Sequence, residues 1–354
     1  MTLPNWKRFA DDREFRARMK LRSEIVFGIR KFFREKGFLE VETPTVVAHP
    51  DMEPTIDPFS TEVVRNDGTK FRAHLITSPE YSCKKLLTAG YERIFEITRC
   101  YRNGEPWGGT HNPEFTMVEW YRANQDYRAV MEDTEQLVQG LAEGLLGTTV
   151  IEYQGKRVDL SAPWPRLTIV EAFKRYADLD LEPFLEDTDK FRRAAREKGY
   201  EVSDSDSFDD IFFRVFLRDI EPNLGLDKPV ILYEYPSCMA ALSRVKPGDP
   251  RVAERFESYV CGIELCNAFS ELTDVTEQRR RLEKDQATRV ELDKERLPLD
   301  EQFLEAVERM PDAAGISLGI DRLVMLLTDA PSIRDVLFFP VSDLFNQTSE
   351  PERA

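Results

Sequence analysis

The sequence has few of the features that mark a nucleic-acid-binding or membrane protein. It contains 49 Lys and Arg against 65 Asp and Glu, and its formal net charge of -16 disfavours a broad basic face for nucleic acid. No apolar run approaches the roughly 20 residues that a transmembrane helix needs. The N-terminus also lacks the basic-then-apolar pattern of a signal peptide. We therefore expect no membrane span and no secretory signal.

Cysteine and histidine are scarce as well. The five cysteines form no C-x-x-C pair and the three histidines are scattered, so the sequence disfavours a zinc site. An odd cysteine count without a disulfide framework indicates a reducing, cytoplasmic location. Both common phosphate-binding loops, G-x-x-x-x-G-K-[ST] and G-x-G-x-x-G after a strand, are absent. If the protein uses a nucleotide, other residues must bind it.

Three segments have periodicities that predict regular structure. Apolar residues recur at helical spacing over 13–36, and the following FLEVETP predicts a short strand that stops at Pro44. Residues 91–103 and 111–123 alternate like strands on either side of a Gly- and Pro-rich turn, which predicts a long antiparallel hairpin. Residues 314–329 predict a strand that runs directly into a helix.

The remaining segments complete an α+β pattern. Residues 165–230 are mostly helical and are interpreted as an insertion or a peripheral layer, and residues 255–272 predict two further strands. Residues 276–296 predict a charged helix with no role beyond covering the sheet. We expect one catalytic domain over 1–342, followed by a disordered tail over 343–354.

The predicted hairpin carries residues suited to a nucleotide. Arg102 offers a planar fork of donors that matches a phosphate, and Phe115 can stack under a purine ring. Glu105 and His111 flank the loop between the strands, where they can fold over a ligand. These residue types, in this order, indicate a nucleotide site without a glycine-rich cradle.

The last predicted strand presents small residues on one face. Gly315, Ser317 and Gly319 alternate along it, and small residues there allow a ligand to lie against the backbone. Arg322 opens the following helix beside that surface.

The three segments, in this order, resemble the three signature motifs of class II aminoacyl-tRNA synthetases. The resemblance implies the class II catalytic core, a mixed and mostly antiparallel sheet flanked by helices, with ATP as substrate. The first motif builds the dimer interface in that family, which implies a homodimer. The ATP-binding residues that the resemblance implies are Arg102, Asn103, Gly104, Glu105, His111, Asn112, Phe115, Glu264, Leu265, Gly319 and Arg322.

Within class II, the sequence resembles the lysyl branch. The resemblance is carried by TSPEY (77–81), HNPEFTMVEWY (111–121) and IELCNAFSELTD (263–274). In lysyl enzymes the positions of Glu257 and Glu264 hold Mg²⁺, which prefers carboxylate oxygens. The position of Glu271, seven residues further on, meets the distal ammonium of the substrate. The implied substrate-binding residues are Ser78, Pro79, Glu80, Glu119, Tyr121, Asn267, Glu271 and Ser317.

Three departures from the lysyl pattern bear on the substrate and the loop. Ala268 and Ser317 stand where lysyl enzymes have glycine, and a bulkier pocket floor at Ser317 favours an isomer of lysine. The loop after Arg102 is one residue longer than is usual and carries Pro106 and Trp107 at its tip.

The first catalytic helix begins near residue 13, which leaves no room for an anticodon-reading barrel and predicts no anticodon recognition. In length and motifs the chain is similar to the elongation factor P–(R)-β-lysine ligases. That resemblance implies activation of (R)-β-lysine, or lysine, with ATP and Mg²⁺ and transfer to a lysine side chain of elongation factor P. The alternatives are a truncated lysyl-tRNA synthetase, an inactive regulatory paralog and a small-molecule amide synthetase. Intact Arg102, Glu264, Glu271 and Arg322 argue against an inactive paralog.

Overall fold

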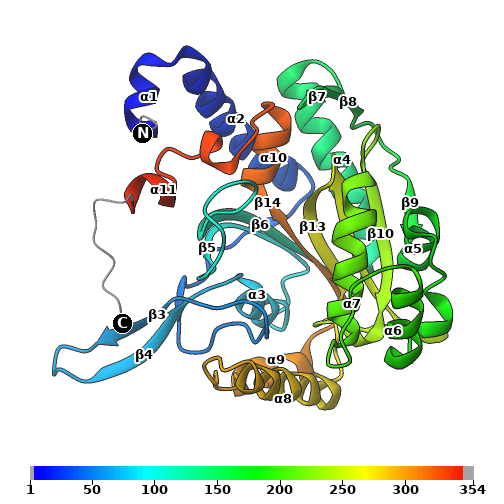
Figure 1. Cartoon of the computed structure of the whole chain (residues 1–354). Coiled ribbons are helices and arrows are strands. Elements are labelled where there is room, and N and C mark those ends of the chain that lie inside the picture. Colours follow the sequence, from blue (N-terminus) through cyan, green and yellow to red (C-terminus); the bar gives the residue numbers. More distant parts are fainter. Residues whose placement is uncertain (1–3, 346–354) are drawn as a thin grey trace. The chain divides into compact units, whose positions relative to one another are not determined.

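The computed structural model describes residues 4–345, which fall into two compact units. Unit 1 comprises Met1–Trp120, Asp274–Met310 and Leu318–Ala354, and unit 2 comprises Tyr121–Thr273 and Pro311–Ser317. The helices and strands follow one another along the chain as Figure 1 labels them. No helix within residues 4–345 combines the length and apolar character that crossing a bilayer requires.

The largest sheet among the described residues has nine strands and confirms the predicted α+β class. Its order is β1-β5-β6-β14-β13-β12-β10-β9, with β11 paired to β12. The strands are β1 (Leu39–Glu40), β5 (Arg93–Tyr101), β6 (Glu114–Ala123), β9 (Arg166–Thr168), β10 (Val230–Pro236), β11 (Val245–Lys246), β12 (Asp249–Val260), β13 (Ile263–Ser270) and β14 (Ala313–Gly319). The pairs β1–β5 and β9–β10 are parallel, whereas β10–β12 and β12–β13 are antiparallel.

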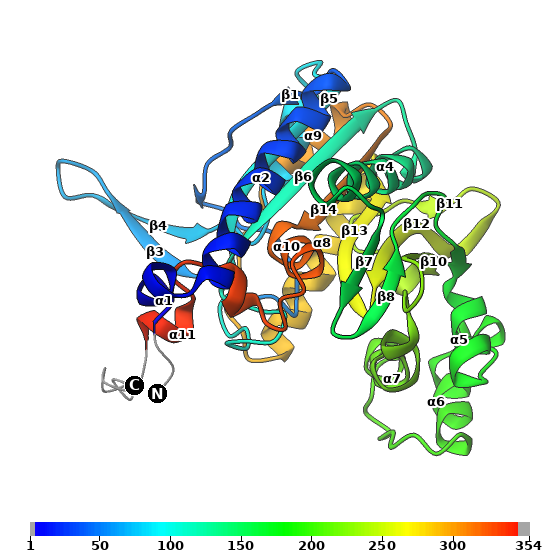
Figure 2. The ribbon, with the colours of Figure 1, turned by 90° about the horizontal axis from the view of Figure 1, so that it is seen from above.

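In unit 1 the long helix α2 (Arg13–Glu35) covers the strands of the predicted hairpin, as Figure 2 shows. Asp12 caps it by accepting from the Phe15 amide at 3.0 Å. Its buried Phe33 packs against Phe95 of β5 and Trp120 of β6, with ring centroids 4.8 and 5.0 Å apart. The helix predicted over 13–36 and the strand–turn–strand pattern that follows are therefore both confirmed.

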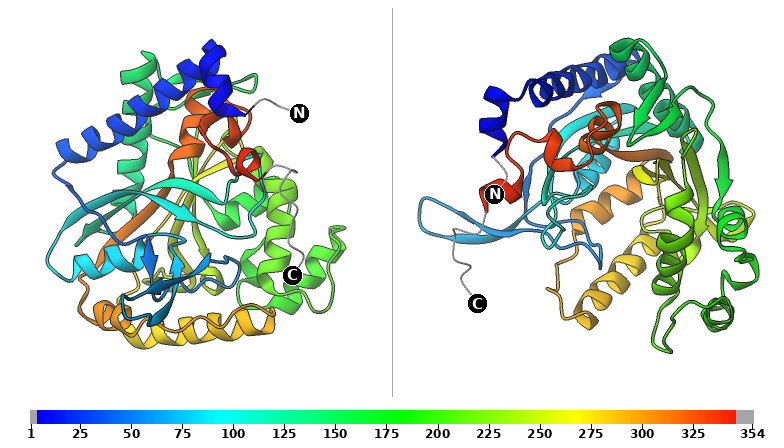
Figure 3. Two further views of the ribbon diagram at one scale, coloured as in Figure 1. Left: turned by 90° about the vertical axis from the view of Figure 1, so that its left-hand side faces the viewer. Right: turned by 45° about the horizontal axis from the view of Figure 1, so that its top comes forward.

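Three further groups of elements complete the body of unit 1. A hairpin of β3 (Ser60–Val64) and β4 (Lys70–Leu75), joined by β2 (Val46–Val47), projects from it in Figure 1. Helices α8 (Val275–Glu291) and α9 (Glu301–Arg309) lie side by side, as both views of Figure 3 show. Helix α3 (Glu80–Leu87) packs on α9 through the stacked rings of Tyr81 and Phe303, and α10 (Ile320–Leu327) follows β14.

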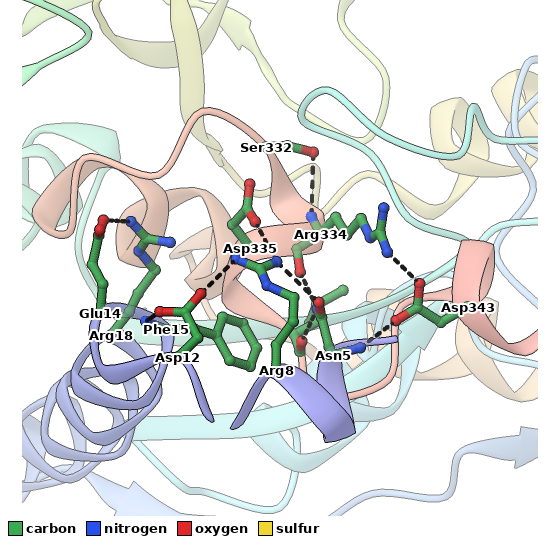
Figure 4. Close-up of polar contacts among 11 residues, drawn as sticks. Asn5, Arg8, Asp12, Glu14, Phe15, Arg18, Ser332, Arg334, Asp335 and Asp343 are labelled. Atoms are coloured by element: carbon green, nitrogen blue, oxygen red, sulfur yellow. Dashed lines mark hydrogen bonds and ion pairs between the residues drawn. The ribbon is translucent and has the colours of Figure 1, made fainter. Parts of the chain in front are cut away.

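The two ends of the described chain meet within unit 1, as Figure 4 shows. Asn5, buried at the start of α1 (Asn5–Asp11), donates its side-chain amide to the carbonyls of Arg334 and Leu337. These lie around η5 (Ile333–Val336), which is followed by α11 (Val341–Leu344). The tail expected to be disordered begins at Asp343, yet this residue is the third of α11 and pairs with Arg334 at 2.7 Å. Residues 346–354 lie outside the described part of the chain.

Unit 2 contains the strands from β7 to β13 and the predicted helical insertion. Its elements besides those of the large sheet are α4 (Tyr127–Leu146), β7 (Val150–Tyr153), β8 (Lys156–Asp159), α5 (Ile169–Ala177), η1 (Glu182–Phe184), α6 (Thr188–Glu197), α7 (Phe208–Val215), η2 (Phe216–Ile220), η3 (Glu221–Asn223) and η4 (Ser237–Met239). Figure 2 shows α5, α6 and α7 grouped beside β10. Phe173, Phe191 and Phe212 anchor their shared core, so the helices predicted within 165–230 are present.

Candidate active site

The loop between β5 and β6 in unit 1 is held by backbone hydrogen bonds at both ends. At its start, the Arg102 amide donates to the Pro113 carbonyl at 2.9 Å and the Asn103 amide donates to Asp57 at 2.7 Å. Near its end, Gly108 and His111 exchange two hydrogen bonds around Gly109, whose φ of 59° is left-handed and suits glycine. The loop is therefore a fixed scaffold for the side chains that sequence places on it.

Arg102 lies over Phe115, with its guanidinium carbon 5.1 Å from the ring centroid. Its Nε is buried and has no hydrogen-bond partner among residues 4–345. A buried guanidinium nitrogen normally finds an acceptor. The pair thus combines a cation with donor capacity and an aromatic face, which are the two features that the sequence predicted for binding a nucleotide phosphate and base.

His111 links the loop to α10. Its Nε2 lies 3.2 Å from Nη2 of Arg322 and 3.9 Å from a carboxylate oxygen of Glu105, and its Nδ1 is 3.2 Å from the Thr110 hydroxyl. Arg322 also donates from Nε to the Thr110 carbonyl at 3.4 Å. The structure therefore brings the predicted residues Glu105, His111 and Arg322 together in one cluster.

Asp321 ties the three predicted motifs together, although sequence reasoning did not select it. This buried residue accepts from the Thr116 amide of β6 at 2.7 Å and pairs with Arg22 of α2 at 2.5 Å. Arg22 in turn donates to the Thr116 hydroxyl. Because Asp321 precedes Arg322, these contacts fix the start of α10 and the position of Arg322. The only signal in the sequence is an acidic residue beside an arginine, which is too common to interpret.

Asn112 and the loop tip are supported from the C-terminal segment. The buried Asn112 amide donates to the Glu114 carbonyl at 2.6 Å, and its oxygen accepts from the Val341 amide at 3.1 Å. The Ile333 amide donates to Gly109 at 2.7 Å. Asn112, predicted to contact ATP, therefore holds the loop through both ends of its side chain. Asn103 accepts locally from the Gly104 amide, and Gly104 has a positive φ.

The TSPE segment of unit 1 is held by Asp51, a second residue that sequence reasoning missed. Asp51 is buried and accepts from the Thr77 hydroxyl and from the amide and hydroxyl of Ser78 at 2.9 to 3.0 Å. Pro79 precedes α3, and Glu80 is its first residue. Glu80 pairs with the buried ammonium of Lys84 one turn later. A substrate amine that binds Glu80 must therefore share this carboxylate with Lys84.

Two of the predicted ammonium ligands in unit 1 lie around one buried thiol. Burial raises the pKa of Cys83 well above its usual value, and the charges of Glu119 and, more weakly, Glu80 raise it further. Glu119 is itself buried, with 2% of its surface exposed. The thiol itself contacts Glu96 at 3.7 Å, so Glu80, Glu96 and Glu119 all act on Cys83, and the paired Lys84 offsets the charge of Glu80.

The titration of Asp51 should appear in the stability of the protein. Burial, followed by the charge of Glu80, raises the pKa of Asp51 from 3.8 to about 7. Between about pH 4 and about pH 7, Asp51 therefore stays protonated in the folded state but is ionised in the unfolded chain. The free energy of unfolding accordingly falls as the pH rises through this range. Asp51→Asn removes the titration, so the variant should gain up to about 4 kcal/mol over wild type between pH 4 and pH 8. Urea unfolding at both pH values measures this; a pH-independent difference would contradict it.

Glu257 of unit 2 sits in a dense polar network on β12. Its Oε1 accepts from Arg255 at 2.7 Å, and its Oε2 accepts from the hydroxyls of Tyr235 and Tyr259 at 2.6 and 2.5 Å. Burial raises the pKa of Glu257; Arg255 opposes this shift, and the charge of Glu264 adds to it. The carboxylate is thus fixed in orientation by three donors.

The residues present fit a magnesium ion, as tested by their donor chemistry. A carboxylate has about four lone-pair positions that can accept hydrogen bonds or bind a metal ion. The three donors to Glu257 use both positions on Oε2 and one on Oε1, so one position on Oε1 is left for a metal ion. Glu264 faces Tyr259 across the β12–β13 ladder, close enough for its charge to raise the pKa of Glu257. A cation between two such carboxylates favours both ionised forms. Within residues 4–345 no group of three or more His, Cys, Asp or Glu could hold a metal ion on its own, so phosphate or water oxygens would have to complete the shell of a bound Mg²⁺.

Asn267 lies directly opposite Glu257 and is oriented by the same arginine. Its side-chain oxygen accepts from Nε of Arg255 at 3.0 Å, so its NH₂ group remains as the donor that a substrate carboxylate needs. The Ser317 hydroxyl on β14 lies 3.5 Å from the Asn267 carbonyl. Leu265, predicted to contact ATP, lies on β13 and has only 1% of its surface exposed.

Tyr121 and Glu271 meet at Gly315 in unit 2. Glu271 follows β13, is fully buried and has its amide fixed by the Ala313 carbonyl at 2.8 Å. A Cβ atom at position 315 would lie closer than 3.0 Å to both Oε1 of Glu271 and the ring of Tyr121, which is nearer than a Cβ normally approaches another heavy atom. Glycine at this position is therefore required because the two side chains occupy the space. Glu257 on β12, Glu264 on β13 and Glu271 directly after β13 are seven residues apart, and they do not lie along one helix.

Comparisons with known proteins agree with this geometry. The family model described as tRNA synthetases class II (D, K and N) matches residues 6–343. A lysine–tRNA ligase of Moorella thermoacetica is 44% identical over 323 residues, which cover 90% of this chain and 64% of that protein. The chain thus spans less than two thirds of the length of this relative.

Two shorter relatives match over almost their whole length. An elongation factor P–(R)-β-lysine ligase of Proteus mirabilis is 38% identical over 329 residues, which cover 92% of this chain and 95% of that protein. The corresponding ligase of Haemophilus influenzae is 37% identical over 343 residues, covering 96% and 99%. With the matched motifs, the sheet and the residue clusters above, these findings show that the chain belongs to the class II tRNA synthetase family of ligases.

Proposed function

We propose that this protein activates a lysine-type amino acid, with (R)-β-lysine as the preferred substrate, by forming an acyl-adenylate from ATP. The packing of Tyr121 and Glu271 against Gly315 carries this proposal. A fully buried carboxylate beside an aromatic ring suits a substrate ammonium, because both a carboxylate and an aromatic face attract a cation, most strongly away from water. Glu80 and Glu119 supply further negative charge for the amino groups. Asn267 would donate to the substrate carboxylate.

In the first step an oxygen of the substrate carboxylate attacks the α-phosphate of ATP. The bond between the α-phosphate and the bridging oxygen breaks, and pyrophosphate leaves. Arg102 and Arg322 stabilise the charge that develops on the phosphates, and Phe115 holds the adenine by stacking. Mg²⁺ held by Glu257 and Glu264 would neutralise phosphate charge. None of these roles requires a covalent nucleophile from the protein.

In the second step the deprotonated amine of a lysine side chain attacks the acyl carbonyl carbon. An amide bond forms, and AMP leaves with the oxygen that linked it to the acyl group. We assign elongation factor P as the acceptor, because the two ligases of that name align with the chain over nearly their whole lengths. We further place the enzyme in the cytoplasm as a homodimer.

The second candidate is charging of lysine tRNA, favoured by the 44% identity to a lysine–tRNA ligase. The test incubates pure protein with ATP, Mg²⁺ and each amino acid, and offers either elongation factor P or tRNA as acceptor. Mass spectrometry of elongation factor P should show one added β-lysyl group. Aminoacylated tRNA with unmodified elongation factor P would establish the alternative. An absence of reaction with either acceptor, and of pyrophosphate exchange, would indicate a regulatory paralog.

Ser317 should bias the choice between isomers. Its hydroxymethyl group occupies the strand face where lysyl-tRNA synthetases carry glycine. The larger side chain reduces the space between this strand and the bound amino acid. Ser317→Gly should therefore raise kcat/KM for lysine relative to (R)-β-lysine by about tenfold, the scale set by one small group in a pocket. Pyrophosphate exchange with each amino acid measures the ratio. An unchanged ratio would remove Ser317 from the specificity argument.

A further inference from the structure

Arg289 is a buried cation that the proposed mechanism does not use. It lies near the end of α8, a helix rich in exposed charge, yet only 1% of its surface is exposed. From its many charged residues, this helix was predicted to have no role beyond covering the sheet. A guanidinium removed from water must be paired and hydrogen-bonded, so its partners indicate its purpose.

All of the partners recorded for Arg289 lie on irregular segments of unit 1. Its Nη1 donates to the carbonyls of Glu53 and Ile56 at 2.8 Å, and its Nη2 pairs with Asp57 at 2.9 Å. Its Nε donates to the Glu295 carbonyl at 3.0 Å. The guanidinium of Arg289 therefore holds residues 53–57 in place. These residues belong to no helix and to no extended strand.

Asp57 transmits this anchoring to the candidate nucleotide loop. It forms an isolated antiparallel bridge with Asn103, whose amide donates to the Asp57 carbonyl at 2.7 Å. Asn103 directly follows Arg102. Lys294 adds a second pair to Asp57 at 3.0 Å. The backbone of Arg102 is thus held by its hydrogen bond to Pro113. The next residue, Asn103, is held by Asp57, which pairs with Arg289.

We propose that Arg289 is a positioning residue for ATP, acting through Asp57 and Asn103 on the placement of the Arg102 guanidinium. The proposal rests on the nucleotide role assigned to Arg102 above. Loss of Arg289 frees residues 53–57, and the backbone that sets Arg102 over Phe115 gains freedom. The TSPE segment is affected less, because Asp51 holds it through three hydrogen bonds of its own.

The test uses Arg289→Met, which keeps a long side chain without the charge, and Asp57→Asn, which weakens the ion pair at a side chain that is 39% exposed. The Kd for ATP with Mg²⁺, measured by calorimetry, should rise about tenfold or more in Arg289→Met and less in Asp57→Asn. The KM for the amino acid in pyrophosphate exchange should change less than about threefold. In the double variant the Kd should rise by less than the product of the two single increases, because both changes remove the Arg289–Asp57 pair.

Arg279→Met is the matched control on the same helix. Arg279 pairs with Glu301 near solvent, and removing it should leave both constants unchanged. Equal increases in the ATP and amino-acid constants of Arg289→Met, or additive effects in the double variant, would overturn the relay and leave Arg289 a purely structural residue. If Arg289→Met does not fold, Asp57→Asn decides alone, and an unchanged ATP Kd in it overturns the relay. Absence of exchange in the wild type would instead contradict the proposed function.

Discussion

Gly315→Ala should raise the KM for the amino acid by about a hundredfold or more, because breaking a buried ion pair costs about 3–5 kcal/mol. The added Cβ meets Oε1 of Glu271 and the ring of Tyr121, and neither can withdraw easily because both side chains are almost completely buried. The carboxylate that would receive the substrate ammonium must then move. Pyrophosphate exchange at varied amino-acid concentration measures the effect, while the ATP constant should change little.

Gly140→Ala provides the control for this prediction. Gly140 lies within α4 of the same unit, and a Cβ there meets nothing within 4 Å. Alanine in the middle of a helix should stabilise the protein by about 0.5–1 kcal/mol and leave the kinetics unchanged. A Gly315→Ala protein that folds and keeps its amino-acid KM within threefold of wild type would show that the ammonium does not bind at Glu271.

Arg102→Lys should lower kcat/KM for ATP by about a hundredfold or more, the usual loss when one preorganised donor to a developing charge is removed. Lysine keeps the positive charge but lacks the planar fork and the stacking surface that Arg102 presents over Phe115. The variant should have a higher KM for ATP and a lower rate of pyrophosphate exchange, whereas its KM for the amino acid should stay nearly constant.

Arg99→Lys makes the same chemical change on β5, three residues before Arg102. Arg99 is exposed and pairs with Glu114, and such a surface pair contributes little, so exchange should be unaffected. Comparable losses in the two variants would indicate a general disturbance of β5 and remove the specific role assigned to Arg102.

Local patterns in the sequence predicted the elements that carry the candidate site. Alternation over 91–103 and 111–123 predicted β5 and β6, although β6 is buried on both faces from Thr116 to Tyr121. Helical spacing predicted α2 because its buried residues, which include Phe15 and Phe33, recur about once per turn on one face. The family resemblance then selected Arg102, His111 and Arg322. The structure places Arg102 over Phe115, and His111 beside Arg322.

The residues that hold this site in place could not be predicted in the same way. Asp321 meets Thr116 across 205 positions of sequence, and Arg289 meets Asp57 across 232. No local period reports contacts of such separation. Arg289 also stands among charged neighbours on α8, so the pattern alone gives no sign that it is buried. Asp51 is a lone acid in an irregular segment, where only its three hydrogen bonds reveal its role.

The most direct test of the central claim is ATP–pyrophosphate exchange by the pure protein with lysine, (R)-β-lysine and (S)-β-lysine. The account predicts exchange that requires both Mg²⁺ and an amino acid with a distal ammonium, fastest with (R)-β-lysine. If none of the three amino acids drives exchange, the assignment of the Glu271 and Tyr121 cluster as a lysine-type pocket is wrong.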